Sequence, residues 1–400
     1  MADLIGCISI SLIFVITFFI ASRWRGISNI LFAAFTLRLL LLLVNHYILP
    51  LPDSDADAKS FENFAWFLAQ DGFKNVLKNY TGPNSYFISW LIAIPYSLFG
   101  RSLLMAKSLS LLFGMGCVFL GYSLSKKIWD IRIANKVGWI IALFPSLNLY
   151  SVLILREVYV SFFLLVAFYG IINWTKNNNF KSFIVSIIGF IGATFFHGAI
   201  FIGIIVFFII IFLISSIKLL KSLKKRRLKI INLFYFLITI TVLALYLSNQ
   251  ITISKLGNFE KILKIENLLQ SIENYNVGDA SYPEWTIPKS PIELFYKGPI
   301  RIIYFLFAPF PWDIKNIYHL IGFFDGLLYM CLAILIFINI KATWKNPALK
   351  IILLILLTYF FVFGLTVGNF GTGIRHKSKF VIPLILLAGP LLPKFLLLKK

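Results

Sequence analysis

The sequence predicts an all-α integral membrane protein that crosses the bilayer many times. Hydrophobic residues make up 59% of the 400 positions, and the mean hydropathy is +0.87. Apolar runs long enough to cross about 30 Å of hydrocarbon recur along the whole chain. Lys and Arg outnumber Asp and Glu by 38 to 16 and gather in short segments between these runs. This composition excludes a soluble domain, whose surface would need far more polar residues.

The apolar runs predict a single transmembrane domain over residues 1–400, with a bundle of about 11 to 13 helices. The runs cover, in chain order, residues 4–21, 27–49, 86–99, 103–124, 137–154, 157–174, 182–196, 199–217, 230–248, 301–311, 318–340, 351–367 and 380–397. The first run is too long for a signal-peptide core and lacks a cleavage site, so we expect it to be a true span. The run 86–99 is short and favours a re-entrant or strongly tilted segment.

The charges predict which loops share a side of the membrane. Lys218–Lys229 holds seven Lys/Arg in twelve residues and no acid. The positive-inside rule therefore places this segment in the cytoplasm. Residues 50–85 and 249–300 together hold eleven of the sixteen carboxylates, so we expect both long loops on the outer face. The net charge of +22 indicates membrane lipids, and not nucleic acid, as the partner of the basic loops.

The first outer loop opens with three aspartates at alternate positions, Asp53, Asp55 and Asp57. In an extended segment alternate side chains point the same way, so all three are expected to face one cavity. Crowded carboxylates near lipid raise one another's pKa or bind a divalent cation such as Mg²⁺ or Mn²⁺. We therefore expect a general base or a metal that holds a pyrophosphate. Helix capping is the alternative, and it accounts for one aspartate.

Apolar residues at helical spacing follow the aspartates within the same loop. Phe61, Ala65 and Leu68 form one such series, and Phe73 and Val76 belong to a second. Charged residues lie between them. This pattern predicts one or two amphipathic helices on the membrane surface.

Two further polar clusters interrupt the apolar sequence. Arg156 and Glu157 lie between apolar stretches, either as a structural ion pair at a helix junction or as a site pair for phosphate and for metal or acceptor. Arg375, His376 and Lys379 are predicted to lie outside, where the positive-inside rule disfavours cations. Arg and Lys bind phosphate, so we expect this segment to contact an anionic substrate. The alternative is a cytoplasmic loop. The lone histidines of the apolar runs, such as His197, are expected to be packing residues.

Together these features resemble the GT-C class of membrane glycosyltransferases. The resemblance rests on the Asp-rich first outer loop, Pro83–Trp90, Leu98–Ser102, Lys107–Ser110, Pro145 and the Arg156-Glu157 pair. It is best over residues 27 to about 200 and is strongest toward the protein-mannosyltransferase and aminoarabinose-transferase branch. The residues 27–250 would form the catalytic core, followed by the second outer loop 249–300 and the C-terminal helices 301–400. The segment before Ile27 would be an additional helix.

The resemblance implies a glycosyltransferase with a polyprenyl-phosphate sugar as donor and a lipid or glycan as acceptor. A catalytic aspartate would come from the first outer loop, and Arg156, Glu157 and Arg375 would hold substrate. The transferred group would be a hexose or pentose, in cell-surface polysaccharide assembly at a bacterial plasma membrane. One alternative is an O-antigen or capsule repeat-unit polymerase, which would depend on outer-face arginines. A transporter or flippase is less favoured, because the sequence shows no internal repeat.

Overall fold

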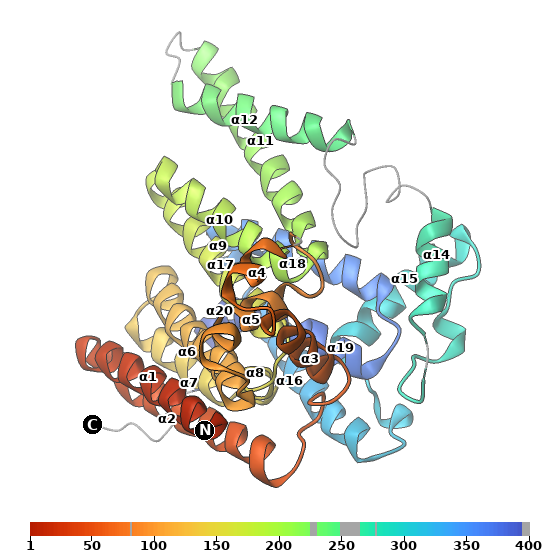
Figure 1. Ribbon diagram of the computed structural model, residues 1–400. Coiled ribbons are helices and arrows are strands. Elements are labelled where there is room, and N and C mark those ends of the chain that lie inside the picture. Colours follow the sequence, from red (N-terminus) through yellow and green to blue (C-terminus); the bar gives the residue numbers. More distant parts are fainter. Residues whose placement is uncertain (81, 225–229, 249–264, 277, 394–400) are drawn as a thin grey trace.

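The computed structural model describes residues 1–80, 82–224, 230–248, 265–276 and 278–393 (Figure 1). Within these ranges the regular structure is helical, and an isolated β-bridge joins Ser281 to Asn369. Seven of the described helices are long and apolar enough to cross a membrane. The seven spans are Ala2–Arg23 (α1), Arg25–Tyr47 (which includes α2, Ser28–Leu43), Leu103–Ile128 (α6), Glu157–Asn177 (α9), Gly198–Ser222 (mainly α11, Phe201–Lys224), Ile317–Ile338 (α16) and Pro347–Thr366 (α18). The predicted class, an all-α polytopic membrane protein, is confirmed.

Several of the predicted spans form shorter elements, so the described part of the chain has fewer full-length spans than expected. The shorter apolar helices are α5 (Phe87–Phe99), α10 (Phe180–Phe196) and the part Leu233–Val242 of α12 (Ile230–Leu247). The run 301–311 lies partly in α15 (Pro291–Phe307), which also contains Glu293, Lys297 and Arg301. The run 137–154 is divided between α7 (Ile131–Leu143) and α8 (Pro145–Tyr150). Pro145 explains this break, because proline cannot continue a helix but readily begins one. The run 380–397 gives only α20 (Val381–Ala388) and the short turn Gly389–Leu391 before the described residues end.

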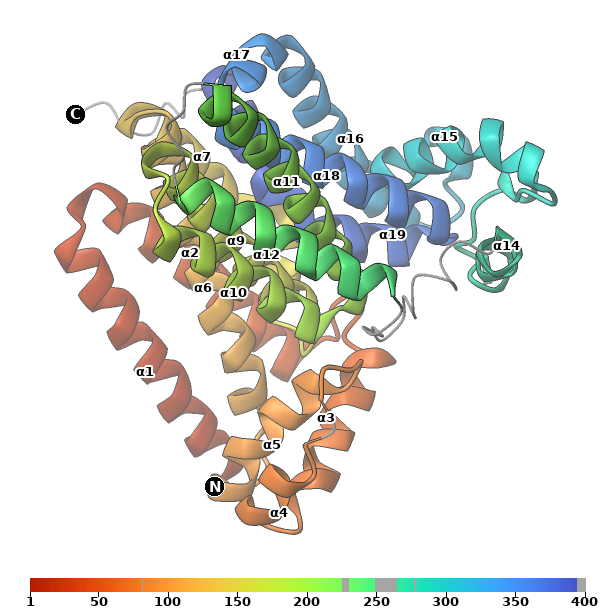
Figure 2. The same ribbon diagram turned by 90° about the horizontal axis from the view of Figure 1, so that it is seen from above.

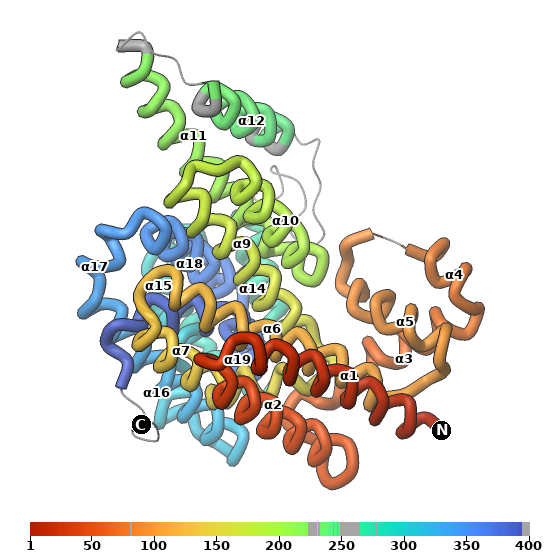
Figure 3. The backbone as a smooth tube through the Cα atoms, turned by 90° about the vertical axis from the view of Figure 1, so that its left-hand side faces the viewer, coloured from red at the N-terminus to blue at the C-terminus, as the bar shows by residue number. Residues whose placement is uncertain are grey.

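The helices run between two ends of the bundle. Figures 2 and 3 place α3 (Asp57–Ala69), α4 (Phe73–Lys78), α5 and the N-terminus at one end, and α17 (Ile340–Lys345) at the opposite end. At the first end the Ser102 hydroxyl donates to the carbonyl of Ala2 over 2.7 Å, which joins the starts of α6 and α1. We call this the site end.

The opposite end carries most of the basic connecting segments, and we call it the basic end. The ammonium of Lys176 donates to the carbonyl of Lys127 over 2.5 Å, which joins the ends of α9 and α6. The connecting segments 22–27, 126–136, 176–181 and 339–350 contain one carboxylate, Asp130. The charge sorting predicted from the sequence is therefore present in the fold. The basic run 218–229 is described only as far as residue 224.

The amphipathic helices predicted in the first outer loop are present as α3 and α4. The apolar face of α3 packs against α5, however, and does not simply rest on lipid. Phe61 and Ala65 are buried in this contact, and the Trp90 indole of α5 donates to the carbonyl of Val76 over 2.8 Å. Phe67, on the other side of α3, is exposed. The loop is therefore a small helical layer that covers the site end.

Close packing of α9 against α10 depends on small residues. A Cβ atom at Gly189 would overlap the backbone of Ala167, and one at Gly170 would overlap the backbone of Ser186. In membranes helices associate through such close contacts, because lipid provides little hydrophobic force between them. This pair fixes α9, whose first residue is Glu157, within the bundle.

Candidate functional site

Three segments that are distant in the sequence meet at the site end. The amide of Tyr282 donates to the carbonyl of Gly368 over 2.7 Å, and that of Phe370 to the carbonyl of Ala280 over 2.8 Å. Arg375, in α19 (Phe370–Lys377), contacts Asp57 at the start of α3. The chain around Ala280 and Tyr282 thus contacts residues 368–370, and Arg375 of the segment 371–379 contacts the start of α3. That residues 50–85, 249–300 and 371–379 share the outer face of the membrane stays a prediction. Residues 249–264 are outside the described part.

A cluster of charged and polar side chains lies where these segments meet. Its members are Asp53, Asp57, Tyr150, Arg156, Glu157, Arg375 and Lys379, and we call it the central cluster. Asn369 caps α19 by accepting from the amides of Gly371 and Thr372. Because α19 starts there, Arg375 and Lys379 project toward the same partner one helical turn apart.

Glu157 is the buried centre of this cluster. Its Oε1 accepts from Nε of Arg375 over 3.0 Å, and Nζ of Lys379 lies 3.5 Å from the same oxygen. Arg375 also donates from Nη1 to Asp57 Oδ2 over 2.6 Å. Burial opposes the charge of Arg375, but Glu157 and Asp57 outweigh it and raise the pKa of the guanidinium. One cation therefore links two carboxylates from different segments.

Arg156 and Glu157 do not form the ion pair that one interpretation of the sequence predicted. Glu157 pairs with Arg375 and Lys379, whereas the Arg156 guanidinium lies over the ring of Phe61 at 5.2 Å. Neighbouring residues at a helix start diverge by about 100°, so each faces a different partner. Arg156 is buried, and its Nε and Nη1 have no hydrogen-bond partner among the described residues. Those donors are available to an anion.

The three aspartates do not face one cavity, and this expectation is wrong. Residues 50–56 form a turn and not an extended strand, with positive φ angles of 62° at Asp53 and 41° at Ala56. Such angles are uncommon outside glycine and reverse the chain direction locally. Asp57 and Asp53 point to the central cluster, while Asp55 forms an exposed pair with Lys59 at 2.5 Å. Asp55 is therefore not a member of the cluster.

Asp53 differs from the other two carboxylates of the cluster, because no cation of the described residues lies within ion-pair distance of it. The hydroxyl of Tyr150 donates to its Oδ2 over 2.8 Å. Tyr150 is itself buried, and burial raises the pKa of its phenol well above the ordinary value. Asp53 as a whole residue is exposed, but surrounding protein displaces water from its carboxylate. This loss of water raises the pKa of Asp53. The hydrogen bond from Tyr150 and the charge of Arg375 act in the opposite direction but do not cancel the rise. A carboxylate with a raised pKa is suited to accept a proton.

His376 lies beside the cluster. Its Nδ1 contacts Nζ of Lys379 at 2.7 Å, and its ring is 5.2 Å from that of His197. Both rings line a cavity of about 200 Å³ with Phe363 and Thr372. The segment predicted to bind substrate thus contributes Arg375 and Lys379 to the cluster and His376 to a neighbouring cavity.

A larger cavity of about 580 Å³ lies on the other side of the aspartate turn, lined by Asp55, Lys59 and Lys107 among others. On its wall the Arg101 guanidinium donates to both oxygens of Glu62, at 2.9 and 2.6 Å. Lys107 belongs to α6 and is buried, with the carbonyl of Asn45 3.3 Å from Nζ. An ammonium held in a membrane helix without a carboxylate partner among the described residues marks a functional position. Lys107 was part of a segment that supports the family resemblance, but it was not predicted as a site residue.

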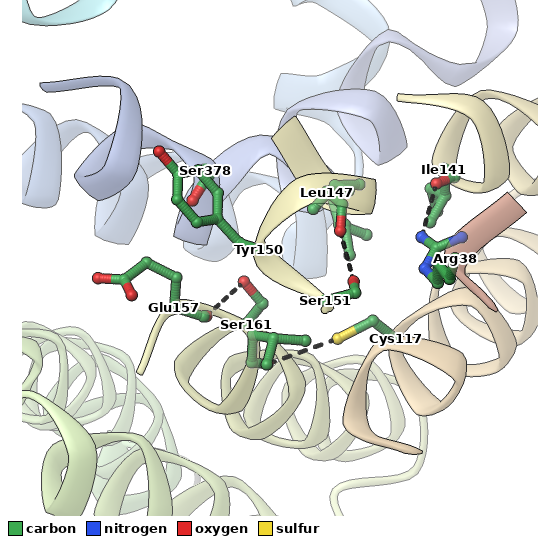
Figure 4. Close-up of a pocket in the computed structure, with 11 residues that line it drawn as sticks. Arg38, Cys117, Ile141, Leu147, Tyr150, Ser151, Glu157, Ser161 and Ser378 are labelled. Carbon is green, nitrogen blue, oxygen red and sulfur yellow. Dashed lines mark hydrogen bonds between the residues drawn. The ribbon is translucent and has the colours of Figure 1, made fainter. Parts of the chain in front are cut away.

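A small cavity of about 10 Å³ extends from the cluster into the bundle, enough for about one water molecule (Figure 4). Figure 4 shows Glu157 and Tyr150 on one side of it and Arg38 on the other. Arg38 lies within α2 and donates to the carbonyls of Ile141 and Ala142 at 3.3 and 3.2 Å. These contacts anchor the last turn of α7, directly before the α8 segment that carries Tyr150.

Another buried pair supports α19 from behind. Nζ of Lys377 lies 3.4 Å from Asp325 of α16 and 4.6 Å from the centre of the Tyr329 ring. Sequence reasoning missed Asp325, although a single carboxylate inside an apolar run is itself a signal of function or of a buried partner. The pair fixes α19 so that Arg375 faces Glu157.

The carboxylates of the cluster do not fit the divalent cation that the sequence suggested. Among the described residues no group of three or more His, Cys, Asp or Glu could hold a metal ion. Asp57 and Glu157 are occupied by Arg375, and Asp53 by Tyr150. The positive charges that would balance a phosphate at the central cluster are therefore those of its arginine and lysine side chains.

The fold and the cluster define the chain as a helical polytopic membrane protein with a buried polar site near one end of its bundle. No protein-family model matches the chain, and no curated protein matches it either.

Proposed function

We propose that the protein is a glycosyltransferase that uses a polyprenyl-phosphate sugar at the outer face of a bacterial plasma membrane. The observation that carries the proposal is the position of Arg375, which joins Glu157 to Asp57 and whose charge also acts on Asp53, a carboxylate held by the Tyr150 hydroxyl. A base beside clustered guanidinium groups is the arrangement that transfer from a phosphate leaving group requires. A donor with a hydrophobic carrier also accounts for a site within a membrane protein.

In this mechanism Asp53 accepts the proton of the acceptor hydroxyl. The acceptor oxygen forms a bond with the anomeric carbon, and the bond between that carbon and the phosphate oxygen breaks. The phosphate leaves with the electron pair, and its charge is held by Arg156 with Arg375 and Lys379 in support. Arg is suited to this role because its planar guanidinium meets a phosphate with two parallel hydrogen bonds.

The cavity of about 580 Å³ would hold the other substrate. Asp55 and Lys59 line this cavity whereas Asp57 and Arg375 do not, so donor and acceptor would approach the turn from two directions. Lys107 on its wall has no carboxylate partner among the described residues and favours an acceptor that is itself anionic, such as a lipid-linked glycan. A repeat-unit polymerase uses the same bond chemistry and is the second candidate, favoured by the buried Arg156 and the partly buried Arg375.

The test is a transfer assay in detergent with a polyprenyl-phosphate sugar and a lipid-linked glycan acceptor. Asp53→Asn keeps the size of the side chain and its bond from Tyr150 but removes basicity, so the turnover should fall by about 10²–10⁴-fold. Asp71→Asn is the matched control, because it makes the same change at an exposed residue of the same loop, outside the cluster and outside the lining of the cavity of about 580 Å³. Equal turnover in the two variants would remove Asp53 from the chemistry.

A second comparison concerns the donor phosphate. Arg156→Lys keeps the charge but not the paired hydrogen bonds, and it should raise the apparent KM for the donor while the acceptor KM stays unchanged. If Arg156→Lys uses the donor as well as the natural protein does, the phosphate is held elsewhere. Single-sugar and whole-repeat donors, compared side by side, separate the transferase from the polymerase.

A further inference from the structure

The basic end contains a second cavity that the proposed reaction does not use. Its volume is about 620 Å³, and it lies between the last turn of α9, the second half of α11 and the region where α17 meets α18. Three lysines line it, Lys176, Lys218 and Lys350, and no carboxylate does. It is therefore a cationic recess at the end of the bundle opposite to the central cluster.

The three ammonium groups lack ionic partners within the described residues. Lys350 lies over the ring of Trp344 at 4.6 Å, and Lys176 donates to a backbone carbonyl. Lys176, Lys218 and Lys350 each lie more than 4.0 Å from every carboxylate of the described residues. Three like charges around one cavity repel one another, so the cavity attracts anions.

The remaining lining residues narrow the chemistry of that anion. Below the lysines the wall is aliphatic, from Leu213 of α11 to Leu354 of α18, and Trp344 lies at the rim. Tryptophan and lysine at the end of apolar helices are typical of the membrane–water interface. A ligand that satisfies both parts has an anionic head beside the lysines and a hydrocarbon chain along α11 and α18. A free phosphate or a nucleotide would leave the aliphatic wall exposed to water.

We propose that this cavity binds one anionic phospholipid, with its phosphate held by Lys218 and Lys350 and an acyl chain between α11 and α18. Clusters of basic residues between membrane helices on the cytoplasmic side recognise anionic head groups in this way. The lipid would join α11 to α18. The site does not depend on the proposed glycosyl transfer.

The experiment uses the full chain in a neutral detergent. Phosphatidylglycerol is titrated in mixed micelles, with the bound lipid counted by native mass spectrometry and the melting temperature followed in parallel. We expect one retained lipid and a rise in melting temperature with phosphatidylglycerol but not with phosphatidylcholine. The double variant Lys218→Gln/Lys350→Gln should weaken the apparent affinity by about 10–30-fold, since each lysine near an anionic head group contributes about 1 kcal/mol.

Two controls make the outcome decisive. The double variant Lys341→Gln/Lys345→Gln removes the same charge from the same end, outside the cavity lining, and should retain the lipid. The charge-keeping variant Lys218→Arg/Lys350→Arg should also retain it and shows that the pocket tolerates substitution. An equal loss in both Gln variants would mean unspecific attraction and would overturn the proposal. An equal rise in melting temperature with inorganic phosphate alone would replace the lipid with a free anion.

Discussion

Arg375 of α19 forms an ion pair with Glu157 of α9 at 3.0 Å, across 218 positions of the sequence. The same guanidinium reaches Asp57 at the start of α3, so one side chain holds three separate segments together. Glu157 is buried, and such a carboxylate is tolerated only when cations and hydrogen bonds compensate for the loss of water. The pair is thus both a structural joint and the core of the proposed site.

The first prediction concerns the stability that this joint provides. Arg375→Ala would leave Glu157 buried with Lys379 as its remaining ionic partner among the described residues. Breaking a buried pair by removal of one partner typically costs about 3–5 kcal/mol. We expect a clear fall in the melting temperature of the purified protein. Arg132→Ala, at an exposed side chain of the basic end, should leave it unchanged, and similar values for the two variants would contradict a structural role for Arg375.

The second prediction concerns pH and rests on the raised pKa of Asp53. Because the folded protein favours the neutral carboxyl, ionised Asp53 lowers stability above that pKa, and the penalty disappears as the pH falls through it. Asp53→Asn should therefore melt higher than the natural protein near neutral pH, and the difference should shrink in acid. Melting temperatures measured across this range check the sign. If Asp53→Asn instead melts lower than the natural protein near neutral pH, and this deficit shrinks in acid, the pKa of Asp53 is lowered and not raised.

The same shift predicts the pH dependence of turnover. A general base works only when ionised, so turnover should decline in acid at a pH above the ordinary range of aspartate, about 3.9. Asp55→Asn, whose carboxylate lies outside the cluster, should show an unchanged acid limb. If the acid limb moves in Asp55→Asn and stays unchanged in Tyr150→Phe, the base is Asp55 and not Asp53. Tyr150→Phe should shift the limb upward, because it removes a hydrogen bond that favours the ionised form.

The class of fold was predictable because length and hydropathy of apolar runs depend only on local sequence. The partners of Glu157 were not, since Arg375 and Lys379 follow it by more than 200 positions and only the packed bundle brings them near. The turn at Asp53 was missed because positive φ angles at Asp53 and Ala56 leave no periodic pattern. The extra span at 137–154 was predicted because hydropathy windows are insensitive to the break before Pro145.

The third prediction concerns the close contact of α9 and α10. Gly189→Ala places a methyl group against the Ala167 backbone, which cannot move without shifting the helix. Overpacking of this kind costs about 1–3 kcal/mol. The melting temperature should fall, and expression in the membrane should decrease with it. Ile188→Ala, on the exposed face of the same helix, loses side-chain volume without this clash and should melt near the natural protein.

The last prediction concerns orientation in the membrane. Asn79, Asn274 and Thr372 are exposed and belong to the three segments that meet at the site end, while Lys181 is exposed at the basic end. Single cysteines are placed at these positions in a background with Cys7 and Cys331 replaced by serine, because both natural thiols are exposed. A membrane-impermeant thiol reagent added to intact cells should label the first three sites and leave Lys181→Cys unlabelled until the membrane is opened. The basic end would then be cytoplasmic, as the positive-inside rule requires. Labelling of Lys181→Cys alone would invert the chain, and it would exclude an outer-face reaction at Asp53 and Arg375.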